Sequence, residues 1–129
     1  MSDKFTVEII SPDKSILMSE TNEVVIPSYE GQMGILKDHI PLITFLRPGI
    51  IFVQNEEIKK YFVEEGTVEF SNNKLLILTS TAKDLKELKN DTIKELLNQA
   101  EKRLGDENFS DKERYLLSYK INTLKEISG

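Results

Sequence analysis

The chain contains no cysteine and no tryptophan, and His39 is its single histidine. Without cysteine, a disulfide framework, a thiolate metal site and a thiol nucleophile are excluded. A lone histidine also makes a zinc site or a nucleophile–base pair hard to assemble. We therefore predict no catalytic residue, no metal site and no cofactor, and we interpret His39 as a structural or interface residue.

Long apolar runs are also missing. No stretch of about 18 apolar residues is present, so we expect no transmembrane helix. The first residues carry neither the apolar core of a signal peptide nor an arginine-rich presequence, and we expect no targeting segment. The net charge of −5 argues against nucleic acid as a partner. The 129 residues suit one domain, or one domain with a small appendage.

The first two thirds of the chain consist of short runs rich in Val, Ile, Phe and Thr, separated by turn residues. The expected strands are residues 5–10, 15–20, 23–28, 50–54, 58–64, 67–70 and 74–80. Many short strands with regular turn signals are typical of a β-sandwich or β-barrel. We therefore predict an all-β unit that ends near residue 81.

One segment within this unit is irregular. Three of the four prolines and three of the six glycines lie between Val24 and Gly49. Glycine serves where φ is positive or where backbones come close, and proline ends strands. The run Gly31-Gln32-Met33-Gly34 lacks the third glycine of a dinucleotide fingerprint, and no βαβ pattern surrounds it. We expect a specialised surface here, not a phosphate cradle.

After Ala82 the hydrophobic pattern takes on helical spacing. The apolar positions are Ile93, Leu96, Leu97, Ala100 and Leu104, and then Leu117, Ile121 and Leu124. Residues 92–95 and 110–113 both fit a capping box, and residues 105–108 break the pattern. We predict two helices of about 13 and 17 residues that form an antiparallel hairpin. Each apolar stripe is narrow, so the hairpin needs the β unit or a partner to hold it.

The second predicted helix has a basic stretch. Between positions 112 and 125 it carries four basic residues and one acidic residue. This pattern suits a solvated helix face, or a basic face that meets an acidic partner surface. Tyr115 and Tyr119, four positions apart, either add contact area for a partner or lie on the β unit.

Several motifs together point to a family. They are VIP at 25–27, EGQMGIL at 30–36, HIPLI at 39–43, LRPG at 46–49, FVEEGTVEF at 62–70 and NKLLILT at 73–79. This set resembles the signature of the ε-subunit family of bacterial F-type ATP synthases. Glu65 stands where that family usually has a glycine. The resemblance covers essentially the whole chain.

The resemblance implies an α+β chain. An N-terminal flattened β-sandwich of about ten strands, residues 1–85, would precede a C-terminal antiparallel two-helix hairpin, residues 86–129. It implies a non-catalytic rotor subunit of the central stalk, which couples proton-driven c-ring rotation to ATP synthesis. The implied partners are the γ subunit and the c-ring, with transient contacts to the β and α subunits. The subunit would be peripheral on the cytoplasmic side of the plasma membrane, associated with it only through the complex.

The resemblance also implies two sets of site residues. The γ and c-ring interface would comprise Tyr29, Glu30, Gly31, Gln32, Met33, His39, Pro41 and Leu42. Within it, Gln32 would face the c-ring, where some members have an acid, and His39 would face γ. With the hairpin extended, the residues in contact with the β subunit would be Lys112, Arg114, Lys120 and Lys125.

The hairpin of this family is a mobile regulator that extends along γ and blocks ATP hydrolysis. As one continuous helix, residues 92–127 would span roughly 50 Å. Some members bind ATP through an I/L-D-x-x-R-A motif. In the corresponding residues 88–93, Lys89 stands at the acid position and Thr92 at the arginine position, so we predict weak or no ATP binding. Whether the hairpin inhibits hydrolysis in this chain stays open. The alternatives are the mitochondrial δ subunit of the same family, a stand-alone small-ligand-binding β-sandwich and a small carboxylate-dependent enzyme.

Overall fold

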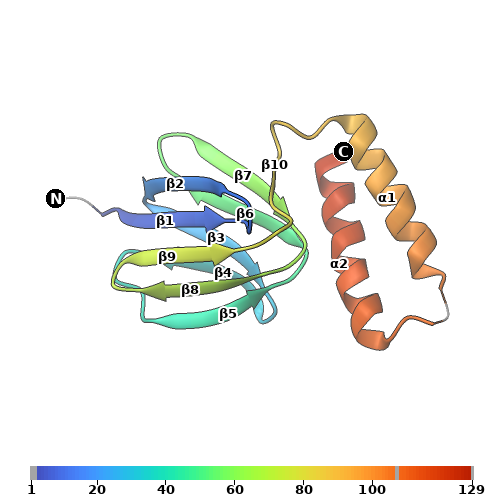
Figure 1. Ribbon diagram of the computed structural model, residues 1–129, viewed down its shortest axis with the longest axis horizontal. Coiled ribbons are helices and arrows are strands. Elements are labelled where there is room, and N and C mark those ends of the chain that lie inside the picture. The colour runs from blue at the N-terminus through green and yellow to red at the C-terminus, as the bar shows by residue number, and fades with distance from the viewer. Residues whose placement is uncertain (1–2, 107, 129) are drawn as a thin grey trace.

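The computed structural model describes residues 3–106 and 108–128, and consists of ten strands followed by two helices (Figure 1). This α+β architecture confirms the predicted fold class. The strands are β1 (Phe5–Ile10), β2 (Ser15–Thr21), β3 (Glu23–Ser28), β4 (Gly31–Leu36), β5 (Leu42–Leu46), β6 (Gly49–Gln54), β7 (Ile58–Val63), β8 (Gly66–Ser71), β9 (Lys74–Leu78) and β10 (Lys83–Asp84). The sequence did not predict β10, and it left the apolar runs of β4 and β5 without a strand assignment.

The strands form one sheet that curls into two layers. Its order is β10-β7-β6-β3-β5-β8-β9-β1-β2, with β4 added beside β3. The ladder between β1 and β9 is parallel, whereas the other ladders are antiparallel. Strands β1 and β9, distant in the sequence, thus lie side by side in one layer, and the helices stand at one end of the sandwich (Figure 1).

Strand β3 forms the corner between the two layers. Its ladder with β6 ends where Val25 pairs with Phe52, and its contact with β5 begins where Ser28 pairs with Leu46. Pro27 lies between these points and has no N–H to continue the first ladder. The strand therefore continues through Pro27, as expected for residues 23–28, but it changes its partner there.

Two glycines of the irregular segment serve the two purposes predicted for them. Gly31 has a φ of 123°, which allows the tight β3–β4 turn. A Cβ atom on Gly49 would lie 2.5 Å from the Cβ of Pro27, so only glycine lets the two segments approach this closely. The irregular composition thus builds the corner of the sandwich.

The core lies between the two layers and uses alternate residues of each strand. Strand β7 departs from this alternation, because Tyr61, Phe62 and Val63 are all buried. Tyr61 and Val63 belong to the sandwich core. Phe62 belongs to a second cluster with Ile93 and Leu124 of the helices. The helical hairpin therefore covers the outer side of β7.

The helices are α1 (Asn90–Leu104) and α2 (Asp111–Ser128), slightly longer than predicted. They pack on each other through Ala100, Leu117 and Ile121, three residues of the predicted stripes. No helix in the described part of the chain is long and apolar enough to cross a membrane.

One of the two predicted capping boxes is present. The amide of Glu113 donates to Ser110 Oγ at 3.1 Å, and Glu113 Oε1 accepts from the amide of Ser110 at 3.4 Å. The box predicted at residues 92–95 is wrong, because α1 begins at Asn90 and Lys89 caps it without a side-chain hydrogen bond. Of the predicted loop at 105–108, residue 107 lies outside the described residues.

Candidate functional site

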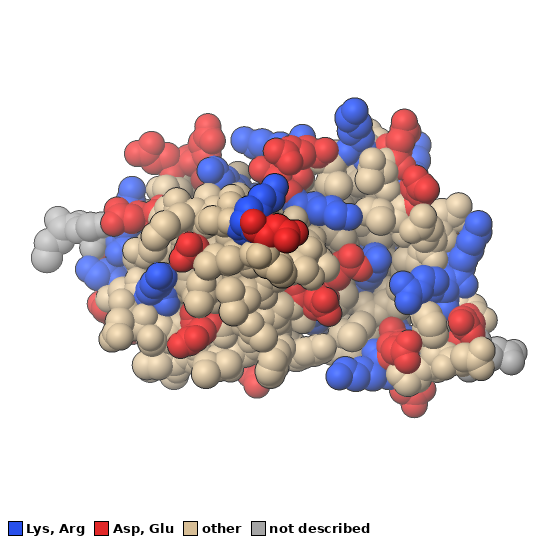
Figure 2. All heavy atoms as spheres, viewed as in Figure 1, with Lys and Arg blue, Asp and Glu red and all other residues tan. Residues whose placement is uncertain are grey.

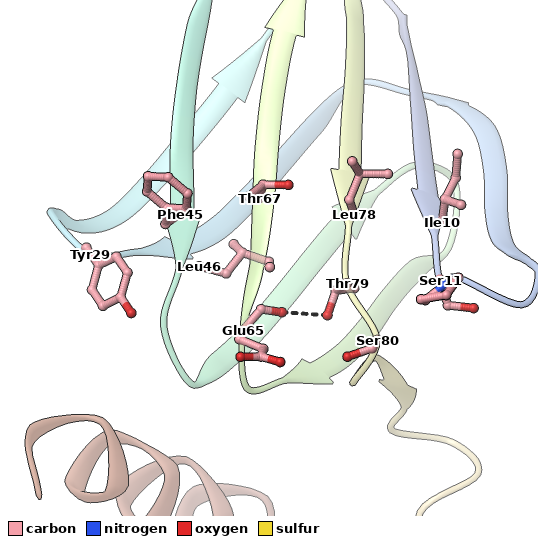
Figure 3. Close-up of a pocket in the computed structure, with 12 residues that line it drawn as sticks. Ile10, Ser11, Tyr29, Phe45, Leu46, Glu65, Thr67, Leu78, Thr79 and Ser80 are labelled. Carbon is pink, nitrogen blue, oxygen red and sulfur yellow. Dashed lines mark hydrogen bonds between the residues drawn. The ribbon is translucent and has the colours of Figure 1, made fainter. Parts of the chain in front are cut away.

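A row of side chains crosses the outer face of the second layer. Phe45 of β5 pairs with Thr67 of β8, Thr67 pairs with Leu78 of β9, and Leu78 pairs with Ile10 of β1. Paired residues of neighbouring strands point to the same face of a sheet. They line a groove of about 710 Å³ at the end of the layer nearest the hairpin (Figure 3).

This face exposes large apolar side chains. The exposed fractions are 75% for Ile43, 55% for Phe45 and 45% for Leu78. Tyr29 extends the face from the β3–β4 turn, where its amide donates to the carbonyl of Phe45 at 3.1 Å. In Figure 2 most of the surface over β5, β8 and β9 is uncharged, with a few scattered acidic and basic side chains. We call Ile10, Tyr29, Ile43, Phe45 and Leu78 the outer apolar face.

Two threonine hydroxyls, that of the buried Thr79 and that of the partly buried Thr81, fix the polar end of the groove. Thr79 Oγ1 donates to the carbonyl of Glu65 at 2.5 Å (Figure 3), and it lies 3.0 Å from Thr81 Oγ1. Thr81 Oγ1 in turn accepts from the amide of Glu64 at 2.9 Å. These bonds tie the β7–β8 turn to the segment after β9, so the groove has a fixed shape.

The segment that joins β4 to β5, residues 37–41, carries more exposed apolar surface, and we call it the docking loop. Ile40 is 74% exposed, and Leu36 just before the loop is 55% exposed. His39 packs edge-on against the buried ring of Phe70, with ring centroids 5.9 Å apart, and its Nδ1 lies 2.7 Å from the carbonyl of Ile40. The histidine thus supports the loop from beneath.

The structure divides the predicted γ and c-ring residues between two places. Residues 29–33 surround the β3–β4 turn, whereas residues 39–42 belong to the docking loop and the start of β5. The six residues of β4 separate these places by about 20 Å. Met33 and Leu42 are only partly exposed and pack against the sandwich core. The predicted residues therefore form two surfaces instead of one.

The predicted residues omit most of the outer apolar face. Only Tyr29 was included, while Ile10, Ile43, Phe45 and Leu78 were missed. A signal for them exists in the apolar runs at 42–46 and 75–78. An antiparallel strand with one solvated face alternates apolar and polar residues, so an unbroken apolar run indicates that both faces are covered.

Two of the four basic residues of α2 are engaged within the chain. Lys120 Nζ pairs with Glu64 Oε1 of the sandwich at 2.5 Å. Arg114 donates to the carbonyl groups of Leu104 at 3.3 Å and Asp106 at 2.9 Å. The remaining two, Lys112 and Lys125, are exposed.

A cation–π contact also joins α2 to the sandwich. The guanidinium carbon of Arg47 lies 3.9 Å from the ring centroid of Tyr119. Tyr115 donates a hydrogen bond to the Tyr119 hydroxyl at 3.4 Å, which lowers the pKa of Tyr119, and the charge of Arg47 acts in the same direction. The same hydrogen bond raises the pKa of the donor, Tyr115. Tyr119 thus lies on the sandwich, one of the two placements that the sequence allowed.

The geometry of the site suits binding more than chemistry. The outer apolar face offers contact area, and the β3–β4 turn offers exposed polar groups. Within residues 3–106 and 108–128, no group of three or more His, Asp or Glu side chains is placed to hold a metal ion. A large exposed apolar patch with a polar border is typical of a protein interface.

Comparison with known proteins identifies a family that this chain matches. A model of the family "ATP synthase, Delta/Epsilon chain, beta-sandwich domain" matches residues 4–84. The chain is 46% identical, over 99% of its length and 100% of the relative's, to an ATP synthase epsilon chain of Pelagibacter ubique. It is 33% identical to one of Parvibaculum lavamentivorans, over 98% of this chain and 97% of that one.

Two solved structures share the fold. One is a chain of the Euglena gracilis mitochondrial ATP synthase OSCP/F1/c-ring structure, with a TM-score of 0.75 and 20% identity. That match covers 97% of this chain and 79% of the other. The second is a chain of the Tetrahymena thermophila mitochondrial ATP synthase central stalk/c-ring structure, with a TM-score of 0.69, 16% identity and 96% coverage of both chains.

Proposed function

The chain belongs to the ATP synthase delta/epsilon chain family, and on this premise we propose that it is a non-catalytic subunit of the rotor. In this proposal the β-sandwich, residues 1–85, binds the γ subunit and the c-ring and transmits rotation between them. The hairpin, residues 86–129, acts as a separate regulatory unit. The subunit is peripheral on the cytoplasmic side of the membrane, and it is held there by the complex.

The outer apolar face is the observation that carries the proposal. Its exposed Ile43, Phe45 and Leu78 lie on regular strands of a packed sandwich. Apolar side chains on a rigid scaffold lose little conformational freedom when they bind, and aromatic anchors commonly dominate interface energies. We assign this face and the docking loop to the γ subunit.

The β3–β4 turn suits a different partner surface. Glu30 and Gln32 are exposed there, and the turn is separated from the docking loop by the length of β4. These polar groups fit the polar loops of the c-ring. Two surfaces at opposite ends of one strand give the sandwich a way to hold both partners at once.

Charge substitutions on the outer apolar face test the proposal. Phe45→Glu and Leu78→Glu should each weaken binding to purified γ subunit about thirtyfold, the equivalent of ~2 kcal/mol for an interface anchor. Calorimetric titration measures the affinity. Ile58→Glu, at a 50% exposed apolar position on β7, is the matched control and should bind like the wild type. Equal affinity for all of these chains would overturn the assignment.

The contacts between the hairpin and the sandwich support a regulatory role. They comprise the Phe62 cluster, the Lys120–Glu64 ion pair and the contact of Arg47 with Tyr119. Three cavities of about 390, 470 and 310 Å³ are lined by residues of both parts. Small, partly polar interfaces of this kind favour relative motion of the parts that they join.

Undocking would relieve one unfavourable feature of these contacts. The Nε of Arg47 is buried and has no hydrogen-bond partner in the described part of the chain. A buried donor without a partner is unfavourable, and water would satisfy it once the hairpin left. Undocking would also free Lys120 from Glu64, so an acidic surface on the β subunit competes directly with the docked state. ATP hydrolysis by a complex that lacks the hairpin tests this regulation.

A further inference from the structure

The docking loop contains a residue in an uncommon backbone conformation. Asp38 has a φ of 67°, in the left-handed region, which aspartate adopts more readily than most residues but less readily than glycine. The amide of His39 donates to the carbonyl of Leu36, the last residue of β4, at 3.1 Å and closes a tight turn. A turn built on an aspartate at positive φ needs support from elsewhere to persist.

Asn73 supplies that support from the β8–β9 turn. The amide of Asp38 donates to Asn73 Oδ1 at 2.7 Å, and Asn73 Nδ2 donates to Asp38 Oδ1 at 2.9 Å. One carboxamide therefore uses both of its polar atoms on a single residue of the docking loop. In Figure 1 the β4–β5 connection and the β8–β9 turn lie together at the end of the sandwich away from the helices.

The β8–β9 turn is itself anchored. Asn73 has a φ of 56°, and its carbonyl accepts from the amide of Thr6 at 3.1 Å, which ties the turn to β1. Phe70, which supports His39, belongs to the same hairpin and is buried. The docking loop thus rests on the β8–β9 hairpin at two points, the Asn73 carboxamide and the Phe70 ring.

The backbone geometry of the turn does not explain an asparagine at position 73. Glycine adopts a positive φ more readily than asparagine does, and the neighbouring Asn72 also has a positive φ, 51°. The structure shows no side-chain hydrogen bond for Asn72 among the described residues, whereas Asn73 makes two. The feature that sets Asn73 apart is its contact with the docking loop.

We propose that Asn73 is a positioning residue for partner binding. Its carboxamide holds the docking loop in the one conformation that presents Leu36 and Ile40 to the γ subunit. The partner in this inference rests on the function proposed above. A loop fixed before binding loses less entropy on association, so the clamp raises affinity without touching the partner.

Asn73→Gly is the sharpest test, because glycine keeps the backbone of the turn and removes only the carboxamide. The Asp38 amide should exchange its hydrogen at least tenfold faster, since it loses its acceptor, and affinity for γ should fall about tenfold. The melting temperature should change little. NMR-detected hydrogen exchange and calorimetric titration measure the two effects.

Two further variants sharpen the comparison. Asn72→Gly makes the same change one residue away and should leave both exchange and affinity at wild-type values. Asp38→Asn keeps an oxygen that accepts from Asn73 and should also bind γ like the wild type, which separates the hydrogen bond from the charge.

Different binding results would overturn the positioning role of Asn73 and the proposed function. Wild-type binding by Asn73→Gly would overturn the positioning role, whether or not the Asp38 amide exchanges faster. Equal losses in Asn73→Gly and Asn72→Gly would overturn it too, because the turn itself would then be responsible. A wild-type chain that does not bind γ would overturn the proposed function, and the positioning role with it.

Discussion

Thr79 shows how a single buried hydroxyl shapes the binding groove. It is 5% exposed, and its donated bond to the Glu65 carbonyl joins the two sides of the groove. Thr79→Val keeps the shape of the side chain but leaves that carbonyl without its donor. We expect the free energy of unfolding to fall by ~1–3 kcal/mol, measured by urea denaturation.

Thr67→Val is the matched control for this substitution. Thr67 lies in the same groove and is half exposed, and the structure gives its hydroxyl no hydrogen bond among the described residues. Its replacement by valine should change stability by less than ~0.5 kcal/mol. If both variants lost the same stability, the Thr79 hydrogen bond would not be what fixes the groove.

At the scale of elements, helix α2 is held on the sandwich by contacts that single substitutions can remove one at a time. Lys120 pairs with Glu64 across the interface, with 15% and 31% of the two side chains exposed, whereas Lys112 on the same helix is exposed. A partly exposed ion pair contributes up to about 1 kcal/mol. Lys120→Gln should therefore raise the undocked population of the hairpin about fivefold, and Lys112→Gln should leave it unchanged.

The absence of cysteine makes this measurement direct. Single cysteines introduced at Met18 on the sandwich and Lys125 on α2, both exposed, can carry a fluorescent donor and acceptor. Energy transfer then reports the docked fraction. High salt should weaken docking of the wild type and have less effect on Lys120→Gln, because the screened ion pair is already gone. An identical response of both chains to salt would show that other contacts hold the helix.

The elements also show where sequence reasoning succeeds and where it fails. Alternating apolar residues predicted most strands, and the capping box at Ser110 marked the start of α2 correctly. The start of α1 was missed, because Leu85 and Leu88 pack with Phe62 and bring the chain into the helix before Thr92. Local capping signals cannot anticipate a start that tertiary packing sets.

At the scale of the whole molecule, the features hardest to predict from the sequence depend on which strands lie side by side. The outer apolar face exists because Phe45, Thr67, Leu78 and Ile10 come from four strands that align side by side. The Asp38–Asn73 clamp joins residues 35 positions apart. No local pattern encodes either feature, whereas the family motifs were sufficient to predict the architecture.

The proposed regulation makes a prediction for the assembled complex. A chain without residues 90–129 should raise the rate of ATP hydrolysis, because no hairpin remains to extend and block it, while rotation-coupled proton transport should persist. Unchanged hydrolysis would remove the inhibitory role and leave the coupling role intact. The truncation uncovers Phe62, so a second version with Phe62→Ser controls for aggregation at the exposed β7 face.

The parallel ladder between β1 and β9 also has a consequence for synthesis of the chain. Residues 6–10 of β1, the first strand to be synthesised, pair with residues 74–78 of β9, one of the last strands of the sandwich. Closing so long a loop slows folding and keeps partly paired strands exposed. During translation, the β3–β4 and β6–β7 hairpins can form early, but the sandwich cannot close until β9 has left the ribosome. The helical hairpin emerges next. The sandwich of a nascent chain can therefore close just before the helices that cover Phe62 become available.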